Sequence, residues 1–118
     1  MYIRSMSTNN PLFKGSLTTI ILKLLSEGDR MYGYEITRRV KELSSGGLQL
    51  TEGALYPALH RLEADGLVEV SMEYVGNRPR KYYRLTQHGK KETKSRIAEV
   101  EAFIGQLQLL LNLNPGLR

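Results

Sequence analysis

The stretch that most constrains the fold is LTEGALYPALHRLEADGLVEV, residues 50–70. Leu55, Leu59 and Leu62 recur at steps of four and three, which predicts a helix with one apolar face turned toward a core. Pro57 stands inside this pattern, and because proline lacks an N–H and crowds the preceding turn we expect it to bend the helix. The leucine spacing continues across the proline, so the prediction is one kinked helix rather than two elements.

The ends and the outer face of this helix are also marked in the sequence. Thr51 is a good N-cap residue, and Gly66 stands where a helix C-cap is expected. The face opposite the leucines mixes small residues with hydrogen-bonding ones, which are Gly53, Tyr56, Pro57, His60, Arg61 and Ala64. Such a face can approach another surface closely and still form hydrogen bonds with it.

Two further helices are predicted before this stretch. Residues 1–11 are polar and without period, so we expect a flexible N-terminal arm, with Met6 a candidate for the natural start. A strong helical period then covers residues 16–28, carried by Leu17, Ile20, Ile21, Leu24 and Leu25. A second helix is expected to begin at Tyr32 or Tyr34 and to end at Leu43, before a loop rich in serine and glycine.

A hairpin is predicted after the central helix. Val68, Val70, Met72 and Tyr74 alternate with polar residues, which is typical of a half-buried strand. Gly76, Asn77, Arg78 and Pro79 form the turn, and a second strand follows to Leu85. The order of three helices and a hairpin is that of a winged helix-turn-helix, an α+β fold that is mainly α, in which the third helix can enter a DNA major groove.

The last segment predicts a long helix that begins after Thr86. Its apolar residues recur at alternating steps of three and four: Ile97, Val100, Ile104, Leu107 and Leu111, widened by Phe103 and Leu110. At about 1.5 Å per residue the helix is about 40 Å long, which is comparable to the width of the whole preceding domain. We therefore expect its apolar half to pack against the same helix of a second subunit in a twofold dimer. The alternative is that it folds back over the first helix, and the two arrangements are compatible in part.

These elements divide the chain into an arm at residues 1–11, a winged-helix domain at 12–86, a dimerisation helix at 87–113 and a tail at 114–118. The chain has no cysteine, which excludes disulfides and thiolate metal sites and fits a reducing cytoplasm. It contains no apolar run long enough to span a membrane and no signal peptide at its start. We therefore expect a cytoplasmic protein with no membrane partner.

Positive charge is concentrated in one part of the sequence. The formal net charge of the chain is +5. Between Gly76 and Arg96, eight lysines and arginines stand against one acid, Glu92, so the local excess is larger than that of the whole chain. The Arg-Pro-Arg-Lys segment at the hairpin suits phosphates or a narrow minor groove. The alternative is a solvated basic surface without a nucleic-acid partner.

With these residues in view, the chain resembles the PadR-like transcriptional regulators of the short type with a single C-terminal helix. The resemblance rests on MYGYEI at residues 31–36, TEGALYPALHRLEADGLVE at 51–69 and RPRKYYRLTQHGK at 78–90. It implies a dimeric winged-helix repressor that binds a pseudo-palindromic operator in double-stranded DNA. In several members of the family a small hydrophobic or phenolic compound releases the operator.

The resemblance also implies which residues lie at or near the DNA: Thr51, Glu52, Gly53, Tyr56, Pro57, His60 and Arg61 in the third helix, and Arg78, Arg80 and Lys81 in the wing. From the residues themselves, Lys14 precedes the predicted first helix and is placed to contact a phosphate at its positive N-terminus. Tyr34 is a second phosphate candidate, with core packing as the alternative. His60 is interpreted as a DNA contact, with a pH-sensitive group as the alternative.

Other classes of function find less support in the sequence. No metal-ligand cluster, phosphate loop or activated nucleophile is recognisable, so we expect neither an enzyme nor a cofactor. A protein-interaction module with a basic wing is the main alternative to a DNA-binding repressor. Drug-sensing relatives place aromatic residues between the paired last helices, but here Phe103 is the only one in that helix. An effector cavity lined by Val100, Phe103, Ile104 and Leu107 is therefore less favoured than core packing.

Overall fold

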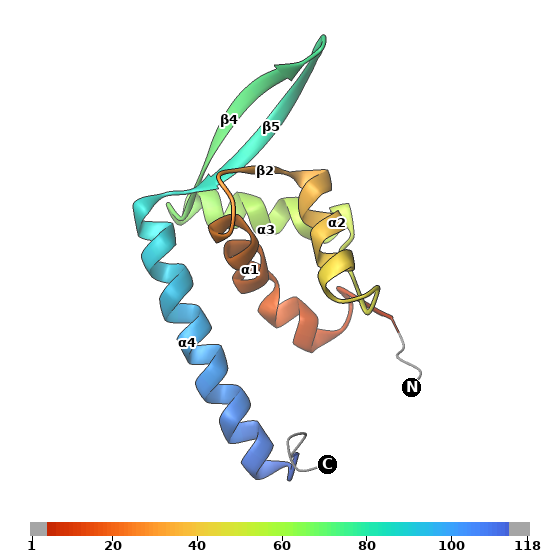
Figure 1. Ribbon diagram of the computed structural model, residues 1–118, viewed down its shortest axis with the longest axis vertical. Coiled ribbons are helices and arrows are strands. Elements are labelled where there is room, and N and C mark those ends of the chain that lie inside the picture. The colour runs from red at the N-terminus through yellow and green to blue at the C-terminus, as the bar shows by residue number, and fades with distance from the viewer. Residues whose placement is uncertain (1–4, 114–118) are drawn as a thin grey trace.

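The computed structural model describes residues 5–113 and has a three-helix body from which a hairpin and a long helix extend in opposite directions (Figure 1). The elements in chain order are β1 (Met6–Ser7), α1 (Pro11–Ser26), β2 (Met31–Tyr32), α2 (Gly33–Leu43), β3 (Leu48–Gln49), α3 (Glu52–Ala64), β4 (Val68–Val75), β5 (Arg78–Leu85) and α4 (Gln87–Leu110). This is the predicted winged helix-turn-helix with a long C-terminal helix. The predicted tail, residues 114–118, lies outside the described part of the chain.

The core lies between the three helices and the base of the sheet. Leu55, Leu59 and Leu62 of α3 are between 0 and 1% exposed, so the predicted leucine face is buried. Ile21 of α1 and Ile36 of α2 are also fully buried, and they belong to the same apolar cluster. α3 is one continuous helix with Pro57 inside it, capped by the Thr51 side chain, as predicted. The core therefore fixes α3 by one face and leaves the other face at the surface.

The first helix begins five residues earlier than predicted. Asn10 caps it, since its side-chain oxygen accepts hydrogen bonds from the backbone N–H groups of Leu12 and Phe13 at 2.9 and 3.2 Å. The prediction that Lys14 precedes the helix was wrong, because Lys14 lies within the first turns of α1. The start escaped the period analysis because Leu12 is exposed and only Phe13 among the first residues joins the core.

Residues before α1 and in the connection between α2 and α3 form short strands that local pattern does not reveal. Met6 and Ser7, which lie within the predicted arm, pair in parallel with Leu48 and Gln49. The loop between α2 and β3 is held by Ser44, whose hydroxyl donates to the Val40 carbonyl at 2.7 Å and accepts from the Leu48 N–H at 2.9 Å. These contacts fix the chain that leads into α3.

The hairpin belongs to a three-stranded antiparallel sheet of order β2-β5-β4. β2 is only two residues long and pairs Met31 with Tyr83 and Tyr32 with Tyr82. Beyond it, β4 and β5 continue as a two-stranded ribbon, the wing, which rises from the body in Figure 1. The prediction of a half-buried strand was therefore wrong for its outer half: Met72 is 54% and Tyr74 73% exposed, because no helix covers the ribbon there.

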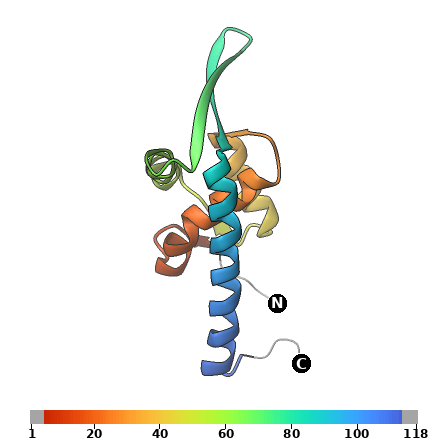
Figure 2. The same cartoon turned by 90° about the vertical axis from the view of Figure 1, so that its left-hand side faces the viewer.

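α4 begins against the body and then leaves it. The Thr86 side chain caps the helix, accepting from the Gly89 N–H at 3.0 Å, and Gly89 and Thr93 are buried. Arg96 donates to the Thr18 hydroxyl of α1 at 3.1 Å. Farther along, the helix continues beyond the body in both views (Figures 1 and 2), and Val100, Ile104 and several leucines are exposed. Within residues 5–113, none of the helices combines the length and the apolar character that a membrane span requires.

Candidate nucleic-acid interface

The outer face of α3 carries all seven residues that the sequence placed in this part of the interface. Thr51, Glu52, Gly53, Tyr56, Pro57, His60 and Arg61 are all exposed. They share one side of the helix because Leu55, Ala58, Leu59 and Leu62 occupy the other and are buried. The face is therefore rigidly held from behind, and it offers small, hydroxyl and cationic groups to a partner.

Among these side chains, Tyr56 lies against the first residue of α2. Its hydroxyl lies so near Gly33 that a Cβ added there would come within 2.3 Å of it. The ring is 37% exposed, so the phenol lies along the protein surface at the start of α2 instead of extending into solvent. Only glycine at position 33 allows this orientation. Beneath it, burial raises the pKa of Tyr83 above its ordinary value, with smaller contributions from Tyr56 and Glu63.

Two shallow grooves lie in this region, one beside α3 and one along α2. The first has a volume of about 330 Å³ and separates the beginning of α1 from α3. Lys14 and Arg61 are its two cations, and Thr51, Gly53 and Pro57 are also among its lining residues. Lys14, although it lies inside α1 and not before it, is thus beside the outer face of α3.

The second groove, of about 300 Å³, lies along α2. Its lining residues are Tyr34, Thr37, Arg38, Lys41, Gln49 and Leu50. Tyr34 is 62% exposed, so it lies at the surface and not in the core. Arg38 lies 5.6 Å from the centre of the Tyr34 ring.

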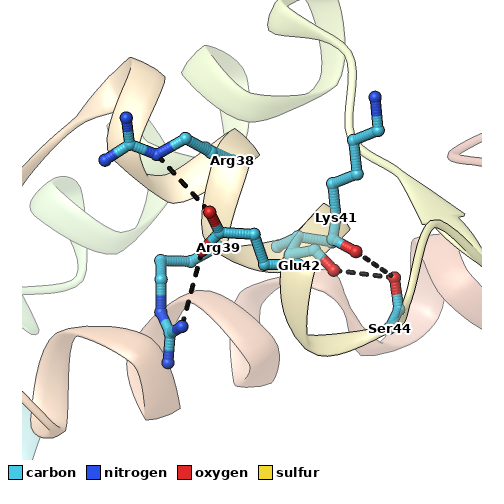
Figure 3. A network of polar contacts seen from close by, with 6 residues as sticks. Arg38, Arg39, Lys41, Glu42 and Ser44 are labelled. Atoms are coloured by element: carbon cyan, nitrogen blue, oxygen red, sulfur yellow. Dashed lines mark hydrogen bonds and ion pairs between the residues drawn. The ribbon is translucent and has the colours of Figure 1, made fainter.

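The sequence-based prediction of the interface missed Arg38, Lys41 and Gln49 in this second groove. Tyr34, Arg38 and Lys41 follow one another at steps of four and three, and this spacing could have placed them on one face of α2. Figure 3 shows Glu42 between Arg38 and Arg39, with N···O distances of 3.9 and 3.6 Å. Glu42 therefore partly neutralises the arginines at this end of α2, whereas Lys41 extends away from it in the same view.

The three predicted cations of the wing do not lie on one face. In the β4–β5 register Arg78 pairs with Val75 and Arg80 with Glu73, whereas Lys81 pairs with Met72. Since side chains alternate along a strand, Arg78 and Arg80 share one face and Lys81 lies on the other. Side-chain hydrogen bonding with Tyr82 raises the pKa of the Arg80 guanidinium above its ordinary value, so this group stays cationic.

The basic region continues from the wing to the first half of α4, where part of its charge is paired. Arg84 lies 3.8 Å from Asp29, and Arg96 donates to the Glu92 carboxylate at 2.9 Å. Lys90, Lys91 and Lys94 are exposed. Among residues 5–113, no group of three or more histidine, aspartate or glutamate side chains is arranged to hold a metal ion.

Comparison with known proteins identifies this arrangement. A family model described as the transcriptional regulator PadR-like family matches residues 21–95, which span α2, α3 and the whole wing. The chain belongs to the PadR-like family. The predicted resemblance is thereby confirmed, and the protein is a transcriptional regulator, not an enzyme.

Individual relatives agree with this assignment. A transcriptional regulator of Mycobacterium tuberculosis is 48% identical over 50 residues, which are 42% of this chain and 47% of that protein. The structure of a transcriptional regulator from Clostridium thermocellum is similar with a TM-score of 0.75 and 31% identity, covering 86% of this chain and 96% of that one. The crystal structure of Bacillus subtilis PadR in complex with operator DNA is similar with a TM-score of 0.63 and 30% identity, covering 69% of this PadR-like chain and 46% of that one.

Proposed function

We propose that this PadR-like regulator is a dimeric repressor that binds an inverted-repeat operator in double-stranded DNA. The observation that carries the proposal is the outer face of α3, where all seven predicted contact residues are exposed and where a groove toward α1 has Lys14 and Arg61 in its lining. The similarity to a PadR bound to operator DNA supports it. A repressor of this kind acts in the cytoplasm, where the chromosome of a bacterium is accessible to it.

In this proposal α3 enters the major groove. Tyr56, His60 and Arg61 carry hydrogen-bonding groups for base edges or phosphates, and Gly53 and Pro57 let the helix come close. Thr51 and Glu52 lie at its N-terminal end, where Glu52 can accept a hydrogen bond from cytosine. Outside α3, phosphates are contacted by Lys14, Tyr34 and the wing residues Arg78, Arg80 and Lys81.

The second subunit is proposed from the uncovered part of α4. The face that buries Gly89 and Thr93 against the body continues along the helix at steps of three and four. Beyond the body its residues have no cover, since Phe103 is 60% and Leu111 60% exposed. A contiguous apolar surface of this kind marks an interface in a soluble protein. The proposed dimer contacts are Ile97, Val100, Phe103, Ile104, Leu107, Leu110 and Leu111.

A twofold dimer predicts the shape of the operator. Two α3 helices related by the axis meet successive major grooves when they lie about 34 Å apart, so each half-site is read by one subunit. The operator should therefore be an inverted repeat, and a single half-site should bind much more weakly.

We further infer that a small hydrophobic or phenolic effector releases the operator. A cavity of about 770 Å³ lies between the end of α1, the base of the wing and α4. Its lining includes the cations Lys90 and Lys94, the acids Asp29 and Glu69, and the apolar Leu25 and Ile97; Arg84 also lines it but is paired with Asp29. The two lysines suit a phenolate or a carboxylate on an apolar ring. The cavity adjoins both the wing and the dimerisation helix, so its occupation can change their relative position.

Selection of bound sequences from a random DNA pool, followed by titration of the recovered site at several salt concentrations, tests the proposal. An enriched inverted repeat whose affinity falls steeply with salt is the expected result, because several phosphates are neutralised per dimer. The matched variant is Arg61→Gln, which removes one proposed DNA contact and should lose affinity for the selected site while keeping its fold. A pool without any enriched motif would overturn the proposal in favour of a protein-interaction module.

A further inference from the structure

Contacts at the point where the wing leaves the body are confined to one face of the sheet. β2 ends at Tyr32, which pairs with Tyr82, so the next residues of β5 have a neighbouring strand on one side only. Two-stranded ribbons are marginal on their own in water. The direction of the wing therefore depends on what its first free residues contact.

The first cross-strand pair beyond β2 on the outer face is Glu73 with Arg80. Both members are held by the segment that contains β2. Arg80 lies over the Tyr32 ring, with its guanidinium carbon 4.0 Å from the ring centre. Glu73 forms an ion pair with Arg30. One side chain from each wing strand is thus tied to the chain just before α2.

Aromatic contacts join these two ties into one cluster. Arg30 also lies over the Tyr82 ring at 4.0 Å, and the Tyr32 and Tyr82 rings meet edge to face with their centres 5.6 Å apart. Cations over aromatic faces and edge-to-face rings are both attractive arrangements. We call Arg30, Tyr32, Glu73, Arg80 and Tyr82 the wing clasp.

The opposite face of the wing has no equivalent of the clasp. The pair at the same level there is Met72 with Lys81, and both are exposed. Tyr74, one step farther out on that face, is 73% exposed. The wing is therefore held from one side, by side chains that lie more than forty residues apart in sequence.

We propose that Tyr32 is a positioning residue that sets the direction of the wing through Arg80, so that Arg78 and Lys81 reach the DNA beside α3. The proposal rests on the proposed function for its consequence at the operator. Arg80, one of the proposed phosphate contacts, thereby also holds the wing, whereas Arg78 and Lys81 lie outside the clasp. The aromatic ring of Tyr32 is the essential part, since the contact with Arg80 is made to its face.

The first test measures the direction of the wing without DNA. The chain has no cysteine, so spin labels can be placed at Asn77→Cys in the wing turn and Ser95→Cys on the exposed surface of α4. Labelled chain is diluted into an excess of unlabelled chain so that distances within one subunit are measured. We expect a narrow distance distribution for the parent protein and for Tyr32→Phe, and a broad or shifted one for Tyr32→Leu. Tyr74→Leu, the same change on the free face, is the matched control and should leave the distribution narrow.

The second test reads the consequence on a selected operator. In Tyr32→Leu the protection of backbone sugars at the wing position should be lost, while protection of the major groove by α3 remains. The slope of log affinity against log salt should fall by about one for each phosphate contact that is lost. Tyr32→Phe should behave as the parent protein.

A second variant guards against a folding defect. Arg80→Met keeps a long side chain and removes the cation, and Arg39→Met, at a half-buried position of α2, is its control for charge. An unchanged distance distribution in both Tyr32→Leu and Arg80→Met would overturn the clasp. Equal loss of operator affinity in Tyr32→Phe and Tyr32→Leu would overturn it too, because it would make the hydroxyl a direct contact. If the parent protein binds no operator, the proposed function fails, while the spin-label distances still show whether the clasp sets the direction of the wing.

Discussion

α3 and the second half of α4 carry the same kind of apolar pattern but differ in what covers it. Leu55 and Leu59 of α3 are fully buried by the body of their own chain. Val100 and Ile104 of α4, at the same spacing, are 39 and 49% exposed. A helical period therefore predicts that one face of the helix is buried, but it does not indicate which chain buries it. In α3 the cover is internal and leaves the other face at the surface, where we propose that DNA binds, whereas in α4 the cover is proposed to come from a second subunit.

The largest effect is expected from a cavity under α3. Leu59→Ala removes a fully buried side chain and should lower the free energy of unfolding by about 2–5 kcal/mol. Urea unfolding at two protein concentrations measures the change, which should be similar at both because the lost contacts lie within one chain. Leu109→Ala is the matched control, since Leu109 is 76% exposed and lies outside the proposed dimer contacts. Equal destabilisation by the two changes would contradict the comparison.

Adding charge to the uncovered apolar face of α4 should prevent assembly and leave the fold of each chain intact. With Leu107→Glu and Leu111→Glu together, carboxylates replace two apolar side chains of the proposed interface, so we expect monomers by sedimentation. Operator affinity should fall by about a hundredfold or more, because the two half-sites are no longer read by one linked pair. Ala102→Glu with Gln106→Glu adds the same charge on the opposite face of the helix and should leave the dimer intact. Tight operator binding by the monomeric variant would show that DNA binding does not depend on assembly.

The sequence predicted the elements that depend on local contacts and missed those that depend on contacts between distant segments. α3 was placed to within a residue because Thr51 and the leucine spacing are local signals. β2 was not predicted, since a two-residue strand has no period of its own and exists only by pairing with Tyr82 and Tyr83. Alternation gave the correct side for Met72 and Tyr74 in β4 but could not tell that nothing covers that side.

The candidate site shows the same limit. The residues on the outer face of α3 could be named in advance because burial of one helix face exposes the other. The placement of Lys14 beside α3, the seating of Tyr56 over Gly33 and the stacking of Arg80 on Tyr32 all join segments distant in sequence. Such contacts depend on how the elements pack, and a single sequence contains no period or cap that indicates them.

A change at the joint between the two regions should affect both of them. A Cβ on Gly89 would lie 2.0 Å from the Leu67 carbonyl oxygen, so Gly89→Ala forces the first turn of α4 away from the body. We expect a loss of roughly 1–3 kcal/mol in stability, as for other overpacked sites, together with weaker operator binding. Thermal unfolding and operator titration measure the two effects. Gly105→Ala has open space around the added Cβ and serves as the control. A Gly89→Ala protein with unchanged stability would show that α4 is not held at this point.

The smallest expected effect is on the pH dependence of stability, which should arise from the body and not from α4. Burial raises the folded-state pKa of Tyr83, so the folded protein holds this proton more tightly than the unfolded chain does. The resulting stabilisation is fully present below the ordinary tyrosine pKa of about 10 and is lost as pH rises from there through the raised value, at up to about 1.4 kcal/mol per pH unit. Tyr83→Phe removes the titrating group, so its stability should fall less steeply than that of the parent protein above pH 10, while below pH 9 the two differ by a constant. Urea unfolding across this range makes the comparison. Because α4 contains no tyrosine, a flatter alkaline slope in the variant would locate this sensitivity beneath α3, and identical slopes would mean that the buried phenol does not control it.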